Sequence, residues 1–260
     1  MRIYLAATNS GMTKVQKAEV IKKYPPKYLL ETFYKGEKSC CVAMNIVGNE
    51  NFLLDSGAFS YMNGKHITKE DMNKYVEKYI CFINQYDVKH FFEMDVDSIF
   101  GLRNVEKWRK QIETQTGKKC IPVWHKQRGV EYWKNMCKEY DYIAIGGLVL
   151  GATTREYPLY KKLLEYATLR GIKVHGLGFT KTKLLREYPF YSVDSSSWSA
   201  GAVRGKQKQT FQNGIIISRK IDTKGKKVDI AKLCSYNFSQ WVLYQKYMEG
   251  VKVCVKQKKI

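Results

Sequence analysis

The sequence lacks the features of a metal-bound, disulfide-stabilised or membrane-spanning protein. Its seven cysteines form no Cys-x-x-Cys; Cys40 and Cys41 are adjacent and the others are scattered, so we expect no metal site and no cofactor. No apolar run approaches the roughly 20 residues that cross a bilayer, and the N-terminal segment reads as a strand rather than a secretory signal. We therefore expect a soluble, cytoplasmic protein with reduced thiols, in the host cytoplasm if it is viral.

Acidic residues are also scarce. The chain has 24 Asp and Glu against 45 Lys and Arg, a formal net charge of +21 in 260 residues. Such an excess favours a polyanionic partner, nucleic acid above all. A membrane surface is disfavoured because no lysine-rich amphipathic helix stands out. The alternative is a merely solvated lysine-rich surface, which AT-rich genomes also favour.

Short apolar runs alternate with amphipathic segments along the chain. The predicted strands are Arg2–Ala7, Phe52–Leu54, His90–Met94, Ile121–Trp124, Tyr142–Ile145, Lys173–His175, Tyr191–Val193 and Gly214–Ser218. The predicted helices cover about 69–85, 103–116, 129–139, 155–170, 180–188 and 228–249. This alternation indicates an α/β fold with parallel strands.

Eight strands in this length fit a single (β/α)8 TIM-type barrel, which typically needs about 250 residues. We therefore predict one barrel domain over residues 1–260, closed by the C-terminal helix at about 228–249. An open doubly wound sheet is the alternative, but the Gly-x-Gly-x-x-Gly fingerprint is missing.

Two stretches interrupt the alternation: residues 12–50, which are long for one crossover, and residues 195–213. The second stretch shows no clear helix and is predicted to be a basic loop; long loops in compact domains are usually functional. Within it Arg204, Lys206 and Lys208 would contact phosphates and Trp198 would stack on a base. A solvated basic loop without a partner is the alternative.

Polar residues or glycines follow six of the predicted strands. They are Asp55; Asp95 and Asp97; His125; Gly146 and Gly147; His175 and Gly176; and Asp194. In a barrel such strand ends converge on one face, where active sites are built. Taken singly, an Asp at a strand end is more often a helix N-cap. Paired carboxylates, however, perform nucleophilic and acid/base work on glycosidic bonds, and Asp55 and Asp194 form such a pattern.

At these positions the sequence resembles the tRNA-guanine transglycosylases. Asp55-Ser56-Gly57-Ala58-Phe59 is similar to their Asp-Ser-Gly-Gly-(Phe/Tyr) motif, and Ala144-Ile145-Gly146-Gly147-Leu148 to their Ile-Gly-Gly-Leu segment. His175-Gly176-Leu177-Gly178 resembles their Met-Gly-Val-Gly, and Asp194 falls where they place the nucleophile. Order and spacing agree over about residues 50–205.

Differences from that family indicate which of its members this sequence resembles most. The Cys-x-Cys-x-x-Cys of the family's zinc subdomain is absent from these 260 residues, and we expect no appended RNA-binding domain. A small, zinc-free, strongly basic chain looks most like the phage-type transglycosylases, which insert 7-deazaguanines into DNA. The glutamine that usually helps to read the base is not obvious, because His125 occupies that strand end.

The resemblance implies catalytic roles for two aspartates. Asp194 would attack the anomeric carbon of the target deoxyguanosine, and Asp55 would act as the general acid and base. Asp95, in preference to Asp97, would accept hydrogen bonds from the N1–H and 2-amino groups of guanine. His125 is a weaker candidate for contact with O6.

The resemblance also implies how the base would be enclosed. Phe59 and His175, which is followed by Gly176, would lie against its two faces. Ser56 and the backbone of Gly146 and Gly147 would approach its polar edge.

These observations lead to a function hypothesis with two alternatives. The chain is expected to replace guanine in DNA with a free 7-deazaguanine base of the preQ0/preQ1 type, through a covalent Asp-linked glycosyl intermediate. The first alternative is the same exchange on tRNA, and the second is a catalytically inactive barrel that binds nucleic acid. The oligomeric state is left open.

Overall fold

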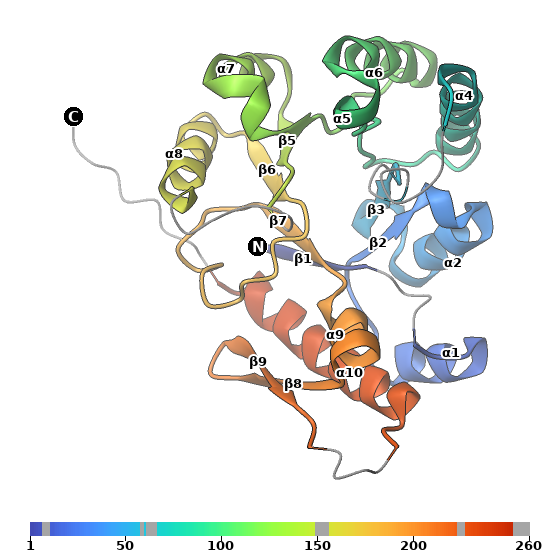
Figure 1. Cartoon of the computed structure of the whole chain (residues 1–260), viewed down its shortest axis with the longest axis vertical. Helices are drawn as coiled ribbons and strands as arrows, with labels where there is room; N and C mark the ends of the chain where they lie inside the picture. Colours follow the sequence, from blue (N-terminus) through green and yellow to red (C-terminus); the bar gives the residue numbers. More distant parts are fainter. Residues whose placement is uncertain (7–10, 58–59, 61–66, 149–155, 223–226, 252–260) are drawn as a thin grey trace. The chain divides into compact units, whose positions relative to one another are not determined.

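The computed structural model describes residues 1–6, 11–57, 60, 67–148, 156–222 and 227–251. Its contacts gather into two compact units, where the sequence predicts one domain over residues 1–260. Unit 1 comprises Met1–Tyr28 and Ile145–Ile260, and unit 2 comprises Leu29–Ala144. Each unit is an α/β assembly of parallel strands and helices, shown in Figure 1. Among the described residues, no helix combines the length and apolar character needed to cross a membrane.

The parallel strands of unit 1 pair in the order β1, β7, β6. β1 (Arg2–Leu5) pairs with β7 (Ser192–Ser195), which pairs with β6 (Lys173–Gly176). The Leu177 N–H then donates to the Ile145 carbonyl, at the end of β5 (Tyr142–Ile145). The remaining elements of this unit are α1 (Lys14–Lys23), α8 (Tyr157–Thr168), α9 (Ser197–Gly205), β8 (Gln207–Gln212), β9 (Ile215–Lys220) and α10 (Ile230–Glu249).

Unit 2 contains a second series of parallel strands. β2 (Leu29–Thr32) pairs with β3 (Phe52–Asp55), and single parallel bridges continue the series from Leu54 to Phe91 and from Phe92 to Ile121. The other elements of this unit are α2 (Glu37–Val47), α4 (Lys69–Gln85), α5 (Asp97–Phe100), α6 (Leu102–Thr116), β4 (Val123–Trp124) and α7 (Gly129–Glu139).

Local signals account for several helix boundaries. Thr68 caps α4 through a capping box, in which its hydroxyl accepts from the Asp71 N–H and the Asp71 carboxylate accepts from the Thr68 N–H. α6 ends at Thr116 and is followed by the C-cap residue Gly117, whose positive φ of 65° suits glycine. These signals lie in the sequence, and α4 covers the predicted range 69–85.

The structure corrects three elements predicted from the sequence. No helix forms over residues 180–188, which adopt turns. The predicted loop 195–213 instead contains α9 and β8. The run Gly214–Ser218 was expected as a parallel strand; its residues 215–218 lie in β9, which pairs antiparallel with β8. The two strands are separated by Asn213 and Gly214, both with positive φ, so the Asn-Gly pair makes a hairpin turn.

Two further differences concern the strand count. β2 was not predicted; its run Leu29–Thr32 includes Glu31, whose side chain is buried, so the segment did not read as an apolar strand. The predicted strand His90–Met94 contributes only isolated bridges at Phe91 and Phe92.

α10 holds unit 1 together through the buried amide of Gln245. This side chain is fully buried. Its Oε1 accepts from the Lys27 N–H at 2.6 Å, and its Nε2 donates to the Ile3 carbonyl at 2.6 Å and the Tyr28 carbonyl at 2.9 Å. One side chain therefore bonds three backbone groups, and it shares the Tyr28 carbonyl with the Leu5 N–H, which donates to it at 3.2 Å.

Replacing Gln245 with Leu should destabilise the protein. Leucine fills a similar volume but leaves the part-buried Lys27 N–H and the buried Ile3 carbonyl without the amide that bonds them, at a cost of about 2 kcal/mol or more. The measurement is urea unfolding. The control is Leu243→Gln at an exposed position of the same helix, which should change stability by less than about 0.5 kcal/mol. Equal effects of the two substitutions would contradict this role of Gln245.

Candidate functional site

In unit 1, the carboxylate of Asp194 is held on one side only. Asp194 lies in β7, and its Oδ1 accepts from the Gly178 N–H at 2.6 Å and lies 3.2 Å from His175 Nε2. Its side chain keeps 14% of its surface exposed. No hydrogen bond reaches Oδ2 from the residues that the structure describes. One oxygen is therefore anchored and the other is open.

His175, which contacts Asp194, is itself held by a second hydrogen bond. The ring is fully buried, and its Nδ1 lies 2.7 Å from the Ser192 Oγ. An ionised carboxylate can only accept, so Nε2 carries the hydrogen bonded to Asp194; in the neutral ring Nδ1 then accepts from the Ser192 hydroxyl. Both ring nitrogens are thus engaged. His175 is placed to orient Asp194, which corrects the expectation that it covers a face of the base.

Glycines shape the backbone beside Asp194. Gly178, the donor to Asp194, has a φ of +64° that favours glycine. At Gly176 a Cβ atom would lie 2.8 Å from Cε1 of the Phe190 ring, so a larger residue would displace the ring. The role of the Gly178 N–H was missed in the sequence because a backbone donor carries no side-chain signal.

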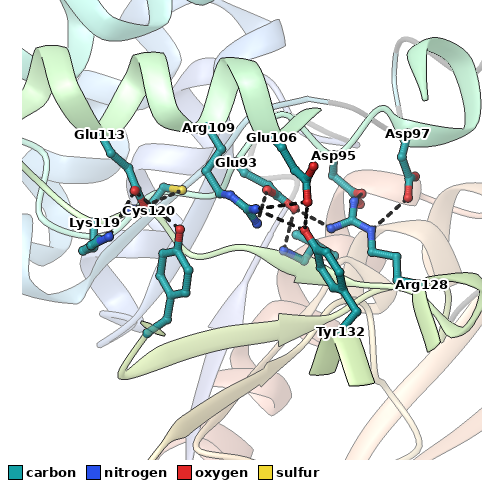
Figure 2. Close-up of polar contacts among 12 residues, drawn as sticks. Glu93, Asp95, Asp97, Glu106, Arg109, Glu113, Lys119, Cys120, Arg128 and Tyr132 are labelled. Atoms are coloured by element: carbon teal, nitrogen blue, oxygen red, sulfur yellow. Dashed lines mark hydrogen bonds and ion pairs between the residues drawn. The ribbon is translucent and has the colours of Figure 1, made fainter. Parts of the chain in front are cut away.

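In unit 2, buried charges form the network shown in Figure 2. Glu93 is completely buried, and its Oε1 accepts from Arg128 Nη1 at 3.0 Å and from the Val123 N–H at 2.8 Å. Its Oε2 accepts from Arg109 Nη1 at 3.3 Å. Arg109 also donates to the Tyr132 hydroxyl at 3.1 Å.

Arg128 joins this network to the predicted base-binding residues. Its Nε donates to Asp97 Oδ2 at 2.9 Å, and its Nη2 lies 3.9 Å from Asp95 Oδ1. The guanidinium is 1% exposed. His125 completes the group, with Nε2 2.6 Å from Asp95 Oδ1. The structure thus brings together Asp95, Asp97 and His125, as the sequence predicts, and adds Arg128.

The same three residues could hold a divalent cation. The potential ligand atoms of Asp95, Asp97 and His125 all lie within 4.8 Å of one another. Arg128, however, already places a positive charge against both carboxylates. We therefore interpret the group as a charge-compensated network and assign it no metal.

Burial and charge shift the pKa values of this network. Burial lowers the pKa of His125, but the hydrogen bond to Asp95 and the charges of Asp95 and Asp97 outweigh it, so the pKa is raised. Burial raises the pKa of Glu93, while Arg128, Arg109 and the Val123 N–H oppose that rise. Burial lowers the pKa of Arg128, but the neighbouring Glu93 and Asp97 outweigh it and raise the pKa. Arg128 therefore stays charged.

The sequence reading missed Glu93, Arg109 and Arg128. A usable signal existed for Glu93, because a carboxylate inside the apolar run from Phe91 to Met94 is seldom buried without a cation. Nothing in the sequence indicated which of the 45 basic residues would supply that cation.

Other predicted site residues are distributed between the two units. Asp55 ends β3 in unit 2 and is partly exposed. The next residue, Ser56, has a buried hydroxyl without a hydrogen-bond partner in the described part of the chain, and its carbonyl accepts from the Tyr75 hydroxyl at 2.7 Å. Gly146 and Gly147 follow β5 in unit 1. Phe59 lies outside the described residues.

The structure corrects the expected role of Trp198. Its indole is fully buried, its Nε1 donates to the Ala6 carbonyl at 2.8 Å, and its ring contacts Phe238. It is a core residue of unit 1 and does not offer a face for stacking. Arg204, Lys206 and Lys208 are exposed.

Comparisons with known proteins add little to this geometry. No protein-family model matches the sequence, and no curated protein matches it. Among solved structures, the chain is similar to "QR15, an Aldolase", with a TM-score of 0.48 and 14% identity over 75% of this chain and 89% of that one. It is also similar to N-acetylneuraminate lyase from Fusobacterium nucleatum, with a TM-score of 0.49 and 13% identity over 100% of this chain and 93% of that one. Because both scores lie below 0.5, nothing about the reaction follows from them.

Replacing Arg128 with Met should strongly destabilise the protein. The substitution leaves Glu93 and Asp97 without their shared cation, and removing one partner of a buried pair costs about 3–5 kcal/mol. Chemical denaturation measures the loss. The control is Glu131→Gln on α7, whose exposed carboxylate pairs with Lys134 and should contribute nothing measurable. If Arg128→Met were no more destabilising than the control, the network would not hold unit 2 together.

His125 should make stability depend on pH. Its raised pKa means that the folded state binds the proton more tightly than the unfolded state does. That contribution is complete below the unfolded pKa of about 6.5 and is lost as pH rises through the folded-state pKa. The difference in unfolding free energy between the parent and His125→Gln should therefore shrink from pH 5.5 to 8.5. A difference independent of pH would contradict this assignment.

Proposed function

We propose that this protein is a glycosyltransferase that replaces guanine in DNA with a 7-deazaguanine base, on a (β/α)8 barrel without a zinc subdomain. The observation that carries the proposal is the Asp194 carboxylate at the end of β7. One of its oxygens is anchored by His175 and Gly178, and the other is open. A carboxylate nucleophile needs this combination of a fixed direction and a free oxygen.

The chemistry proceeds in two displacements. Asp194 Oδ2 attacks C1′ of the target nucleotide, the C1′–N9 bond breaks, and guanine leaves with a proton from Asp55. The Asp55 carboxylate then takes the N9 proton of the incoming base. That nitrogen attacks C1′ and releases Asp194, so no net proton or electron is consumed.

The exchange would run in one direction because of the difference between the two bases. Guanine has a basic N7 whose protonation makes it a better leaving group. A 7-deazaguanine carries carbon at this position, so it leaves poorly once it has been inserted. No energy-rich cofactor is then needed.

The arrangement around Asp95 supports its role as reader of the base. Asp97 is engaged by Arg128 at 2.9 Å, whereas Asp95 meets that guanidinium only at 3.9 Å. Asp95 is also the more exposed of the two, with 19% of its side chain accessible against 9% for Asp97, so it is the better placed to accept from N1–H and the 2-amino group. His125, hydrogen-bonded to Asp95, fixes the direction of that carboxylate.

The net charge supports nucleic acid as the partner. A formal charge of +21 attracts the phosphate backbone whatever the base sequence. A target base inside a duplex must be flipped out before C1′ can be attacked, unless the substrate is single-stranded.

The test is incubation with guanine-containing DNA or with tRNA, together with labelled 7-deazaguanine bases, followed by mass analysis of the nucleosides. The parent should place label in DNA and release guanine. Asp194→Asn should lose on the order of 10³-fold or more in rate, because no carboxylate can form the glycosyl ester. Asp141→Asn, at an exposed position, is the matched control and should keep full activity.

Each other outcome has a defined meaning. Label in tRNA alone would replace DNA with tRNA as the substrate. Abasic product without insertion would indicate a hydrolase. An inactive parent that still binds nucleic acid would favour the non-catalytic alternative, and unchanged activity in Asp194→Asn would exclude the covalent mechanism.

A further inference from the structure

The hairpin of β8 and β9 carries an uncompensated positive charge. No acidic residue occurs between Asp194 and Asp222. Five basic side chains lie in this interval and are exposed; they form what we call the basic hairpin surface, namely Arg204, Lys206, Lys208, Arg219 and Lys220. None of the five makes an ion pair with an acidic side chain among the described residues.

Two of these charges face each other directly. In the antiparallel register Lys208 is opposite Arg219, and Gln207 is opposite Lys220. Opposed residues share a face of the hairpin at about 5 Å between Cβ atoms, and like charges in that position are destabilising. Without an anion nearby, this pair weakens the hairpin that carries it.

The hairpin packs against α10, which lies along it (Figure 1). The side-chain oxygens of Asn237 and Gln240 accept from the Gln209 and Phe211 N–H groups at 2.8 and 3.0 Å. The Phe211 ring packs on Tyr244. Since side chains alternate along a strand, this packing covers the face that bears Gln209 and Phe211.

The opposite face carries Lys208 and Arg219. Its lysine is also positioned, because the Lys208 ammonium lies 4.7 Å from the centroid of the Tyr236 ring. The ring is itself held, since the Tyr236 hydroxyl lies 3.1 Å from Thr210 Oγ1. A fixed cation loses little side-chain entropy when an anion binds.

We propose that the basic hairpin surface binds the sugar–phosphate backbone of nucleic acid, with Lys208 and Arg219 each contacting a phosphate. The inference rests on the nucleic-acid partner of the proposed function but not on its chemistry. A two-stranded ribbon is of a size to enter the major groove or follow a strand. It presents charge on both strands, and the adjoining Arg204 and Lys206 extend that charge toward α9.

This surface replaces part of the interface expected from the sequence. Trp198 is buried in the core and takes no part in it. Arg219 and Lys220, which the sequence reading did not select, are added to the predicted Arg204, Lys206 and Lys208.

The test measures DNA binding by fluorescence anisotropy across a series of salt concentrations. The variant is Lys208→Gln with Arg219→Gln in the full chain. Each lost phosphate contact should reduce the slope of log Kd against log salt by about 0.9 for duplex or about 0.7 for single-stranded DNA. We expect the double variant to lower the slope by about 1.8 for duplex or about 1.4 for single-stranded DNA, and to weaken binding by about tenfold or more at 0.1 M salt.

The matched control is Arg103→Gln with Lys107→Gln on α6, which removes the same two charges from exposed positions of unit 2. It should leave the slope unchanged. Thermal unfolding checks the fold: the hairpin variant should melt close to the parent, because removing the repulsive pair offsets the lost contact between Lys208 and Tyr236.

The outcomes separate this proposal from the base exchange. Equal slopes in the parent and the hairpin variant, or equal losses in the variant and its control, would overturn the hairpin proposal while base exchange could still be observed. Hairpin-dependent binding without base exchange would overturn the enzyme alone. A parent that binds anionic phosphatidylglycerol vesicles but no DNA would overturn the hairpin proposal in favour of a lipid surface.

Discussion

A carboxylate cannot stay in a protein interior unless cations or N–H groups take the place of water, and Glu93 imposes this constraint on unit 2. Its two oxygens require Arg128, Arg109 and the Val123 N–H. Arg128 lies directly before α7, and its guanidinium bonds both Glu93 and Asp97. Because Glu93 also accepts from the Val123 N–H of β4, these bonds connect the start of α7 with β4 and α5. The geometry of Asp95 and Asp97 follows from the same guanidinium.

In unit 1, buried polar groups of the backbone are satisfied by neutral amide side chains. α10 contributes two buried amides, Gln245 beneath β1 and Asn237 beneath β8, and each satisfies three polar groups. The helix therefore serves as the common support for the parallel strands of this unit and for the hairpin. Asn237 and Gln245 are fully buried, whereas an amphipathic pattern would place polar residues on the exposed face of the helix.

The two candidate sites differ in how strongly they hold their reactive groups. Asp97 lies against Arg128 and is 9% exposed, whereas Asp95 is bonded to His125 and is 19% exposed. Asp194 is anchored by a backbone N–H and a histidine, with one oxygen directed outward from the anchor. A fixed carboxylate with an open oxygen suits attack on carbon, and a carboxylate braced by His125 suits recognition of N–H donors.

The sequence by itself determined the alternation of strand and helix, the aspartates at strand ends and the excess of positive charge. Periodicity and capping are local, so α4, β5 and α10 could be located from neighbouring residues. Only the tertiary structure decided that Arg128 neutralises Glu93 and that Trp198 belongs to the core, because each outcome depends on residues far apart in the chain. The hairpin of β8 and β9 is instead set locally by Asn213 and Gly214, a signal that the sequence reading did not use. β2 was also missed, because its run contains Glu31, and only the structure shows that this polar side chain is buried.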